Sequence, residues 1–241
     1  MNTLAIDAAT DRLSVAVAAA DGQRVERHLM GARGHARNMI LMIEELLRVT
    51  GATSPAAISR VVLADGPGSF TGLRVAAAVA KALGRAGRAQ LWTAPSLLGR
   101  AWTARGGRPG LVLSASSALR GEIYAGWYDL AHDRAVHVVH PAVAMGFDEV
   151  RAGRRPDCIV GDASDGMLEA LAAYWGVPLV SREESQADAR GLLELLEVPG
   201  AVSFVGEPDR WEPTYGRPAE AQAKWEREHG RPLPDSTGHS G

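Results

Sequence analysis

The order of the predicted secondary structure elements constrains the fold of this chain more than any other feature. Near the N-terminus, the short apolar run TLAID is followed by RLSVAVA, in which Leu13, Val15 and Val17 alternate with smaller residues as in a strand. Asp21-Gly22 is a hairpin signal between this strand and a third one, RVERHL. Three consecutive strands at the start predict an antiparallel meander.

The period then changes to that of a helix. Apolar residues recur at helical spacing from about His35 to Thr50, and the run VVLAD at 61–65 is the next predicted strand. The glycine-rich turn GPGSFTG leads into a second helix, LRVAAAVAKALGRAG, whose alanines allow close approach of a neighbouring helix. The order βββαβα over residues 1–105 is that of one ribonuclease H-like lobe.

The second half of the chain repeats this order in reduced form. The predicted strands are 110–114, 122–130 and 135–141, followed by a helix near 146–152, the strand DCIVGD at 157–162 and a helix at 166–175. The alternation favours an α/β fold with mixed sheets covered by helices, in two related lobes, 1–105 and 106–217. Residues 218–241 are polar and proline-rich, so we expect a partly disordered tail.

Composition excludes several classes of protein. The chain has 26 Lys and Arg against 28 Asp and Glu, a formal charge of −2, which excludes a purely electrostatic nucleic-acid binder. Cys158 is the single cysteine of the 241 residues, which excludes a disulfide framework and indicates a reducing compartment, by default the cytoplasm. No apolar run approaches the roughly 18 residues of a spanning helix, so no membrane association is expected.

The turn from Asp65 to Gly72 is the most distinctive local motif. Backbone N–H groups between a strand end and a helix start can bind an anion, so Asp65, Gly66, Gly68, Ser69 and Gly72 are candidate nucleotide contacts. The turn lacks the Lys-Ser/Thr pair of a Walker A motif. We therefore favour a tight structural turn in which Ser69 or Thr71 caps the helix.

Aspartates follow three of the predicted strands, Asp7, Asp65 and Asp162. Carboxylates at strand ends could hold Mg²⁺ or orient a water molecule, although aspartate is also common in turns. Asp7 is the strongest candidate of the three for a nucleotide site.

Other reactive side chains show no catalytic pattern. His137 and His140 are three residues apart on a predicted strand and so point to opposite faces. Cys158 lies inside a strand and is expected to be a buried, inert thiol. No catalytic residue, metal or cofactor is therefore expected.

The first helix has more apolar residues than one buried stripe requires. Packing on its own sheet is the ordinary explanation for such residues. Met39, Ile40, Met42 and Ile43 nevertheless cover more than one stripe, which would leave apolar surface for a partner helix.

Taken together, LAIDAAT, ADGPGSFTGLRV, ALRGEIYAGWYD and WEPTYGRP strongly resemble the TsaB family, also called YeaZ. The resemblance extends to about residue 217. It implies the two-lobed actin-like fold (ASKHA) of sugar kinases and heat-shock ATPases. It also implies a role in placing the threonylcarbamoyl group on the adenosine next to the anticodon, in tRNAs that read codons beginning with A.

The resemblance also implies partners. Members of the family bind a catalytic paralogue, TsaD, and act together with the ATPase TsaE. Alone they often form homodimers, and they contact tRNA only indirectly, through the complex. The paralogue's HxxxH metal motif corresponds to Ser96 and Arg100 here, which do not suit iron or zinc. Ser117 and Leu119 stand where many relatives have Asp and Arg, which bears on any polar role of that segment.

In the family the first-lobe helices contact the paralogue. Carried over to this chain, the expected contact residues are His35, Met39, Met42, Ile43, Leu46, Leu47, Phe70, Thr71, Arg74, Val75, Ala78 and Leu83. The chain would then be a non-catalytic scaffold that stabilises an active paralogue.

Three other functions stay open on the sequence. The first is an actin-fold ATPase or phosphotransferase that uses Asp7 and the 66–72 loop. The second is a metallo-glycopeptidase, which the absence of HxxxH disfavours. The third is a free-standing tRNA-binding protein, disfavoured because basic and aromatic residues are not interleaved in the sequence.

Overall fold

The protein is described by a computed structural model in which the placed residues fall into eight ranges. These are 1–31, 35–52, 54–87, 89–118, 121–133, 135–163, 166–186 and 188–216, and for His35 only the backbone is described. The predicted tail at 218–241 lies outside the described residues.

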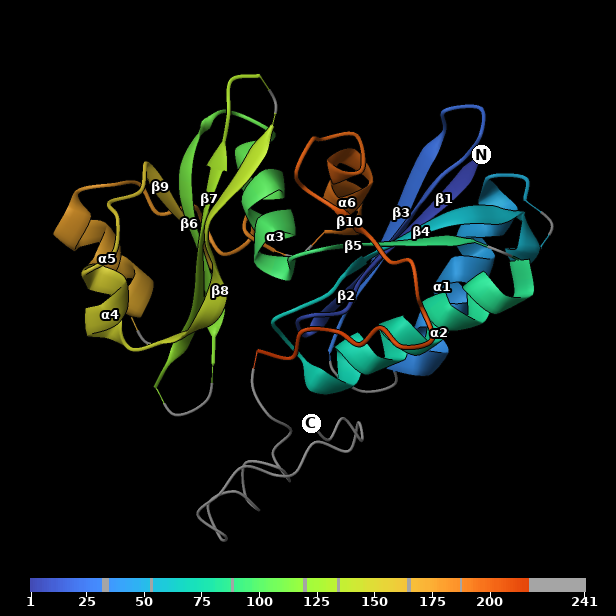
Figure 1. Ribbon diagram of the computed structural model, residues 1–241, viewed down its shortest axis with the longest axis horizontal. Helices are drawn as coiled ribbons and strands as arrows, with labels where there is room; N and C mark the ends of the chain where they lie inside the picture. Colours follow the sequence, from blue (N-terminus) through green and yellow to red (C-terminus); the bar gives the residue numbers. More distant parts are fainter. Residues whose placement is uncertain are drawn as a thin grey trace, which may run out of the picture.

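Two β-sheets form the framework (Figure 1). The first sheet has the order β10-β5-β4-β1-β2-β3. Its strands are β1 (Asn2–Asp7), β2 (Arg12–Ala18), β3 (Arg24–Met30), β4 (Ile58–Ala64), β5 (Gln90–Ala94) and β10 (Ser203–Phe204). The second sheet, with the order β8-β7-β6-β9, contains β6 (Gly110–Ser117), β7 (Ile123–Leu130), β8 (Val136–Met145) and β9 (Cys158–Gly161).

The two sheets share one connection scheme. In the first, β1 pairs antiparallel with β2, β2 antiparallel with β3, and β1 parallel with β4. In the second, β6 pairs antiparallel with β7, β7 antiparallel with β8, and β6 parallel with β9. The predicted order βββαβα is thus confirmed in both halves of the chain.

Helices cover both faces of the framework in layers (Figure 1). The outer face of the first sheet is covered by α1 (His35–Val49) and α2 (Phe70–Gly87), and that of the second by α4 (Phe147–Arg151) and α5 (Met167–Trp175). Between the sheets lie α3 (Ser96–Arg105) and α6 (Ala189–Leu195). A short 3-10 helix, η1 (Pro55–Ala57), precedes β4.

The central core belongs to both sheets. Ala5, Ala16 and Val62 of the first sheet share one buried cluster with Val112 and Tyr128 of the second. Leu97, Leu98, Ala101 and Trp102 of α3 complete the cluster from between them. The alternation of side chains along each strand therefore supplies one face to an outer core and the other to the shared core.

The end of the chain returns to the first sheet. β10 pairs antiparallel with β5, and α6 packs on β1, β2 and β4. The division of the chain at residue 105 stays a prediction, although residues 189–205 pack with the first sheet and also contact β8 of the second, where Val136 N–H donates to the Pro199 carbonyl at 3.0 Å. Within the placed ranges, no helix has both the length and the apolarity that crossing a membrane demands.

Candidate functional site

The apolar residues predicted on the first helix are mostly core residues. Met39, Met42, Ile43, Leu46 and Leu47 each have 9% exposure or less and belong to the cluster beneath the first sheet. They are packed against their own sheet, which leaves little of their surface for a partner, although Met42 also lines a groove beside β3. Their burial supports the ordinary explanation, core packing, and a partner contact through them stays a prediction.

Two neighbours of these residues are exposed instead. Ile40 and Leu41 on α1 have exposures of 50% and 51%. On α2, the predicted contact residues Thr71, Arg74 and Ala78 are exposed. We call these five residues the outer helix face.

The remaining predicted contact residues lie at its margin. Phe70, Val75 and Leu83 are half-buried, with Val75 and Leu83 packed against the first outer core. The side chain of His35 lies outside the described residues, although its backbone begins α1.

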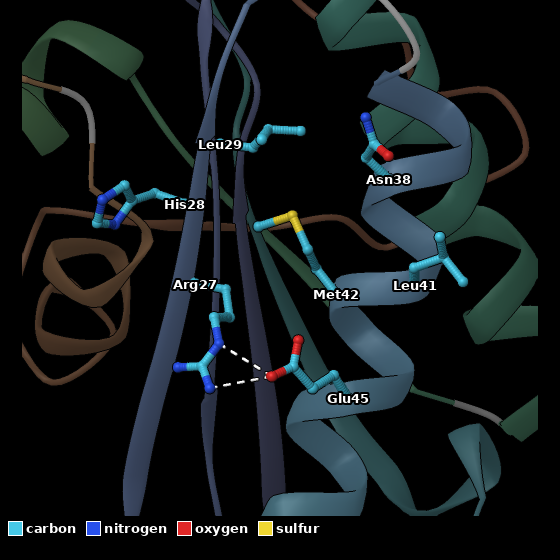
Figure 2. Close-up of a pocket in the computed structure, with 7 residues that line it drawn as sticks. All are labelled: Arg27, His28, Leu29, Asn38, Leu41, Met42 and Glu45. Atoms are coloured by element: carbon cyan, nitrogen blue, oxygen red, sulfur yellow. Dashed lines mark hydrogen bonds and ion pairs between the residues drawn. The ribbon is translucent and has the colours of Figure 1, made fainter.

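A shallow groove of about 280 Å³ lies between β3 and α1 (Figure 2). Leu29, Leu41 and Met42 contribute its apolar surface. Across the groove, Nε and Nη2 of Arg27 donate to Oε1 of Glu45 at 3.1 and 3.0 Å. The groove extends the exposed apolar surface of α1 towards the edge strand of the first sheet.

The glycine-rich turn is tied into its own chain. The N–H of Gly66 donates to Ser96 Oγ at 2.9 Å, that of Ser69 to the Ala9 carbonyl at 2.7 Å, and that of Gly72 to Ser69 Oγ at 3.2 Å. These three groups are therefore not available to an anion. The finding supports a structural turn and argues against Gly66, Ser69 and Gly72 as nucleotide contacts.

The glycines of this turn allow close backbone packing. A Cβ atom at Gly68 or Gly72 would overlap the carbonyl oxygen of Ala9 or Ala8, and one at Gly66 would overlap that of Thr214. The turn thus brings together the β1–β2 connection and the C-terminal segment, which explains why glycine is required at these positions.

Asp7, which is buried, and Asp65, which is half-buried, lie at the carboxyl ends of neighbouring parallel strands. Asp7 is 1% exposed and accepts the N–H of Ala9 at 3.0 Å, and burial raises its pKa to about 6. Burial also raises the pKa of Asp65 to about 7, against the lowering effect of a hydrogen bond from Thr93. Burial therefore makes the charged form of both carboxyl groups less favourable than it is in water.

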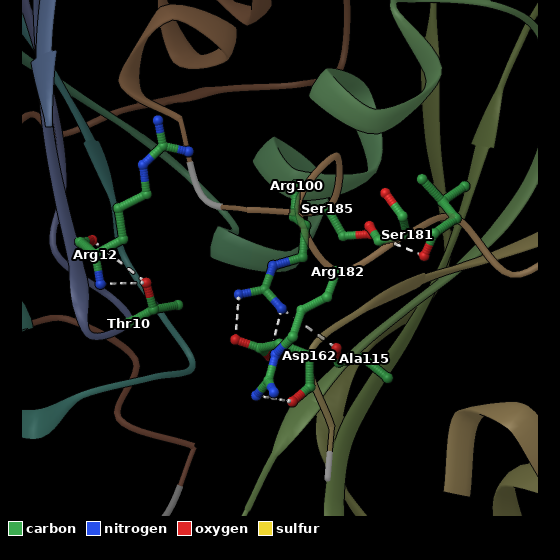
Figure 3. A network of polar contacts seen from close by, with 9 residues as sticks. Thr10, Arg12, Arg100, Ala115, Asp162, Ser181, Arg182 and Ser185 are labelled. Atoms are coloured by element: carbon green, nitrogen blue, oxygen red, sulfur yellow. Dashed lines mark hydrogen bonds and ion pairs between the residues drawn. The ribbon is translucent and has the colours of Figure 1, made fainter. Parts of the chain in front are cut away.

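Asp162 forms an ion pair with Arg100. The Arg100 side chain is 2% exposed, and its guanidinium group binds the carboxylate in a bidentate manner, with Nη2 3.2 Å from Oδ2 (Figure 3). Nη1 also donates to the Ala115 carbonyl at 3.4 Å. Arg100 belongs to α3 and Asp162 follows β9, so this pair joins the central helix to the second sheet.

Ser96 and Arg100 thus have structural partners. Ser96 N–H donates to the Gly66 carbonyl at 2.9 Å while its hydroxyl accepts from Gly66 N–H. Among the described residues, no group of three His, Cys, Asp or Glu side chains is placed to hold a metal ion. Cys158 is buried, and burial raises the pKa of its thiol, as expected for an inert cysteine.

A C-terminal strap, residues 207–216, runs along α2 and was not predicted. Three side chains of α2 bind it: Arg85 contacts Asp209, Lys81 Nζ lies 3.0 Å from Glu212 Oε1, and Arg74 Nε donates to Tyr215 Oη at 3.3 Å. Thr214 N–H donates to the Asp65 carbonyl at 2.7 Å. The sequence showed the motif that begins at Trp211, but the position of the strap depends on contacts with residues more than 120 positions earlier in the chain.

More than half of the chain matches one family model. Residues 30–155 match the model of TsaD, described as tRNA N6-adenosine threonylcarbamoyltransferase. The match includes α1, α2, α3 and the three strands that begin the second lobe.

Two characterised proteins are similar in sequence. The tRNA threonylcarbamoyladenosine biosynthesis protein TsaB of Bacillus subtilis (strain 168) is 25% identical over 236 residues, which cover 93% of this chain and 98% of that protein. The protein of the same name from Escherichia coli (strain K12) is 32% identical over 136 residues, 55% of this chain and 56% of that protein.

Solved structures have the same fold. YeaZ from Pseudomonas aeruginosa superposes with a TM-score of 0.69 at 24% identity, over 89% of this chain and 99% of that one. A second structure, of a protein described as similar to peptidase YEAZ from the same organism, gives 0.70 at 23% identity, over 90% and 99%. The actin-like two-lobed fold expected from the sequence is thus confirmed.

Proposed function

Because the chain belongs to the TsaB (YeaZ) family, we propose that it acts in tRNA threonylcarbamoyladenosine biosynthesis as a non-catalytic scaffold of a TsaD-like transferase. The observation that carries the non-catalytic part is that the groups considered for metal or nucleotide binding are used internally. Arg100, at a position of the paralogue's metal motif, binds Asp162, Asp7 is buried, and the glycine-rich turn binds its own chain.

The outer helix face supports partner binding. Ile40 and Leu41 are exposed on α1, and Ala78 leaves α2 open to close approach. Two helices that pack on a like-folded partner would bury this surface and gain roughly 25 cal/mol per Å² of apolar area, against the cost of association. The same face would form the homodimer when the partner is absent.

Other parts of the proposal follow from the family. A TsaE-like ATPase would join the complex, and tRNA would be bound by the assembled complex rather than by this chain alone, in keeping with its net charge of −2. A cytoplasmic location and the lobe boundaries 1–105 and 106–217 belong to the same proposal.

The test is threonylcarbamoyladenosine formation on a cognate tRNA, measured by nucleoside mass spectrometry in a reconstituted reaction. Product should depend on this chain and should fall by at least tenfold with Ile40→Asp, which places a charge in the contact. Val138→Asp on β8 is the matched control, because Val138 has a similar exposure of 45% but lies on the second sheet. Product that forms equally without the chain would contradict the scaffold function.

Binding to the partner is measured separately. Size-exclusion chromatography of the mixed proteins should show a complex with the wild type and with Val138→Asp, and a weaker one with Ile40→Asp. Circular dichroism of each variant shows whether it is folded. A substitution at Leu46 would not serve here, because Leu46 is fully buried and its change would unfold the core.

A further inference from the structure

Two connections bring five arginines to one end of the second sheet. The end of α3 with its connection into β6 contains Arg105 and Arg108, and the end of α4 with its connection into β9 contains Arg151, Arg154 and Arg155. All except Arg105, which is half-buried, are exposed. We call these five residues the arginine surface.

The two connections are close because β6 and β9 are neighbouring parallel strands. Val112 is opposite Cys158 in the register, so both strands begin at the same edge. Leu111 N–H donates to Asp157 Oδ2 at 2.7 Å, and Asp157 N–H donates to the Leu111 carbonyl at 2.7 Å. The topology, rather than the sequence spacing, therefore gathers these arginines.

An exposed aromatic side chain lies beside them. α5 follows β9 and runs back towards the edge where β9 begins, so that its last residues, Tyr174 and Trp175, lie near Arg151 and Arg155. The guanidinium carbon of Arg151 is 5.5 Å from the centroid of the Tyr174 ring. Tyr174 is nevertheless 61% exposed, which leaves much of its ring open to a ligand.

The backbone of the second connection is held in place. Trp127 Nε1 donates to the Arg154 carbonyl at 2.8 Å, and Arg155 Nε donates to the Trp175 carbonyl at 2.9 Å. Pro156 is buried beneath them. Arginines on an ordered loop lose less conformational entropy on binding an anion than arginines on a mobile one.

Carboxylates near this surface are already engaged. Asp157 accepts the Leu111 N–H, Asp148 pairs with Arg151 at 3.0 Å, and Glu149 accepts the Gly146 N–H at 2.8 Å. Arg154 and Arg155 are both exposed on this loop. Asp148 thus partly neutralises Arg151, and Arg154 and Arg155 are the guanidinium groups that a polyanion would contact.

We propose that the arginine surface binds the phosphate backbone of tRNA in the assembled complex, and that Tyr174 stacks on an unpaired base beside it. The proposal rests on the proposed function and deepens it, because it gives this chain a direct contact where the family resemblance implies only an indirect one. Guanidinium groups bind phosphate with paired hydrogen bonds, and single-stranded RNA bases stack on exposed aromatic rings.

The location suits an extended substrate. α4 and α5 lie at one end of the long axis of the molecule and α1 and α2 at the other (Figure 1). A catalytic partner on the outer helix face would leave the arginine surface open. An RNA the length of tRNA could touch both subunits at once.

The test measures the affinity of unmodified cognate tRNA for the complex with the TsaD-like partner, by fluorescence anisotropy at several salt concentrations. The double variant Arg154→Ala/Arg155→Ala should weaken binding roughly tenfold and reduce the slope of log K against log salt by about 1.4 to 1.8, the effect of two lost phosphate contacts. Tyr174→Ala should weaken binding with no change in slope. The control is Arg24→Ala/Arg210→Ala, two exposed arginines outside the surface, and should leave both quantities unchanged.

Activity separates this proposal from the proposed function. The double variant should raise the KM for tRNA and leave kcat and partner binding unchanged. Product that needs the chain but is insensitive to Arg154 and Arg155, with unchanged tRNA affinity, would overturn the arginine surface alone. Product that forms without the chain would overturn the proposed function.

A lipid surface is the other polyanion that arginines could bind. Vesicles that contain phosphatidylglycerol are therefore a second arm of the experiment, with the same variants. Binding to these vesicles that depends on Arg154 and Arg155, together with unchanged tRNA affinity, would overturn the proposal in favour of a membrane.

Discussion

Charged side chains lie at very different depths in this protein, and depth decides what each one contributes. The Arg100 side chain is 2% exposed in its pair with Asp162, whereas both members of the Arg85–Asp209 pair are at least 70% exposed. Burial removes the screening by water that makes surface pairs weak, but it also makes an unpaired charge costly.

We expect Asp162→Asn to lower the free energy of unfolding by about 3 kcal/mol, because it leaves the Arg100 guanidinium buried without its counter-charge. Asp209→Asn, the matched change in the exposed pair, should cost less than about 1 kcal/mol. Urea unfolding at neutral pH measures both. Equal losses would show that the Arg100 pair is no more important than a surface pair.

A second prediction concerns pH. Because the pKa of Asp65 is raised to about 7 in the folded protein from an ordinary value of 3.8, the folded state binds the proton more tightly than the unfolded state. The stability that this tighter proton binding provides is therefore fully present below pH 3.8, and it is lost as the pH rises to about 7. Asp65→Asn removes this loss, while the amide oxygen can still accept a hydrogen bond from Thr93.

The stability of Asp65→Asn relative to the wild type should therefore be more favourable at pH 8 than at pH 5. Thermal unfolding at both values measures this difference. Tyr128, the other titratable group that interacts with Asp65, has its pKa raised by burial and stays neutral throughout this range. A difference that is independent of pH would contradict a raised pKa for Asp65.

At the scale of elements, α2 packs against three different parts of the chain. Its first turn lies against the β1–β2 connection, its alanine-rich side faces the first sheet, and its charged residues bind the C-terminal strap. Small residues are needed only where the backbone of another segment is close. Gly84 is less constrained than Gly72, whereas a Cβ at Gly87 would lie 3.2 Å from Cα of Ala56.

Gly72 and Gly84, both in α2, should therefore respond oppositely to alanine. A Cβ at position 72 would overlap the Ala8 carbonyl oxygen, so Gly72→Ala should destabilise the protein by more than about 2 kcal/mol. At Gly84 the nearest atom would be 3.4 Å away, and the better helix propensity of alanine should stabilise by about 0.5 to 1 kcal/mol. Denaturant unfolding measures the change in the free energy of unfolding for each variant. If both substitutions were stabilising, the close contact between Gly72 and the Ala8 carbonyl would be ruled out.

At the scale of the whole molecule, the two lobes share a core. The cluster around α3 and α6 contains residues of both sheets, and the strap joins α2 to Tyr124 of the second sheet through the Tyr215 carbonyl at 3.5 Å. A lobe that lost its neighbour would expose this apolar face to water. The two lobes are related in topology and share this buried cluster.

We therefore expect a single cooperative unfolding transition. Differential scanning calorimetry should give one peak with a ratio of calorimetric to van 't Hoff enthalpy of about 1. Trp92 in the first sheet and Trp127 in the second allow each lobe to be followed by fluorescence in variants that retain one of them and lack the other five of the six tryptophans. Two separate transitions would show that the lobes fold independently.

Strand and helix order could be predicted from the sequence because local patterns determine it. Alternation along β2, the apolar run of β4 and the helical spacing of α1 each reflect which side of an element is buried. The glycine-rich turn was also predicted as structural, since its glycines and Ser69 are typical of a helix start.

Tertiary structure alone decided which surfaces are exposed and which charged side chains lie close together. The spacing of Met39, Met42 and Leu46 is the same whether a helix packs on its own sheet or on a partner, so the pattern could not separate core from contact. Arg100 and Asp162 are 62 residues apart, and the arginines of two connections meet only because β6 and β9 are neighbours. Local sequence determines the elements through short-range periodicity and turn chemistry, whereas burial and charge pairing depend on contacts between residues far apart in the chain.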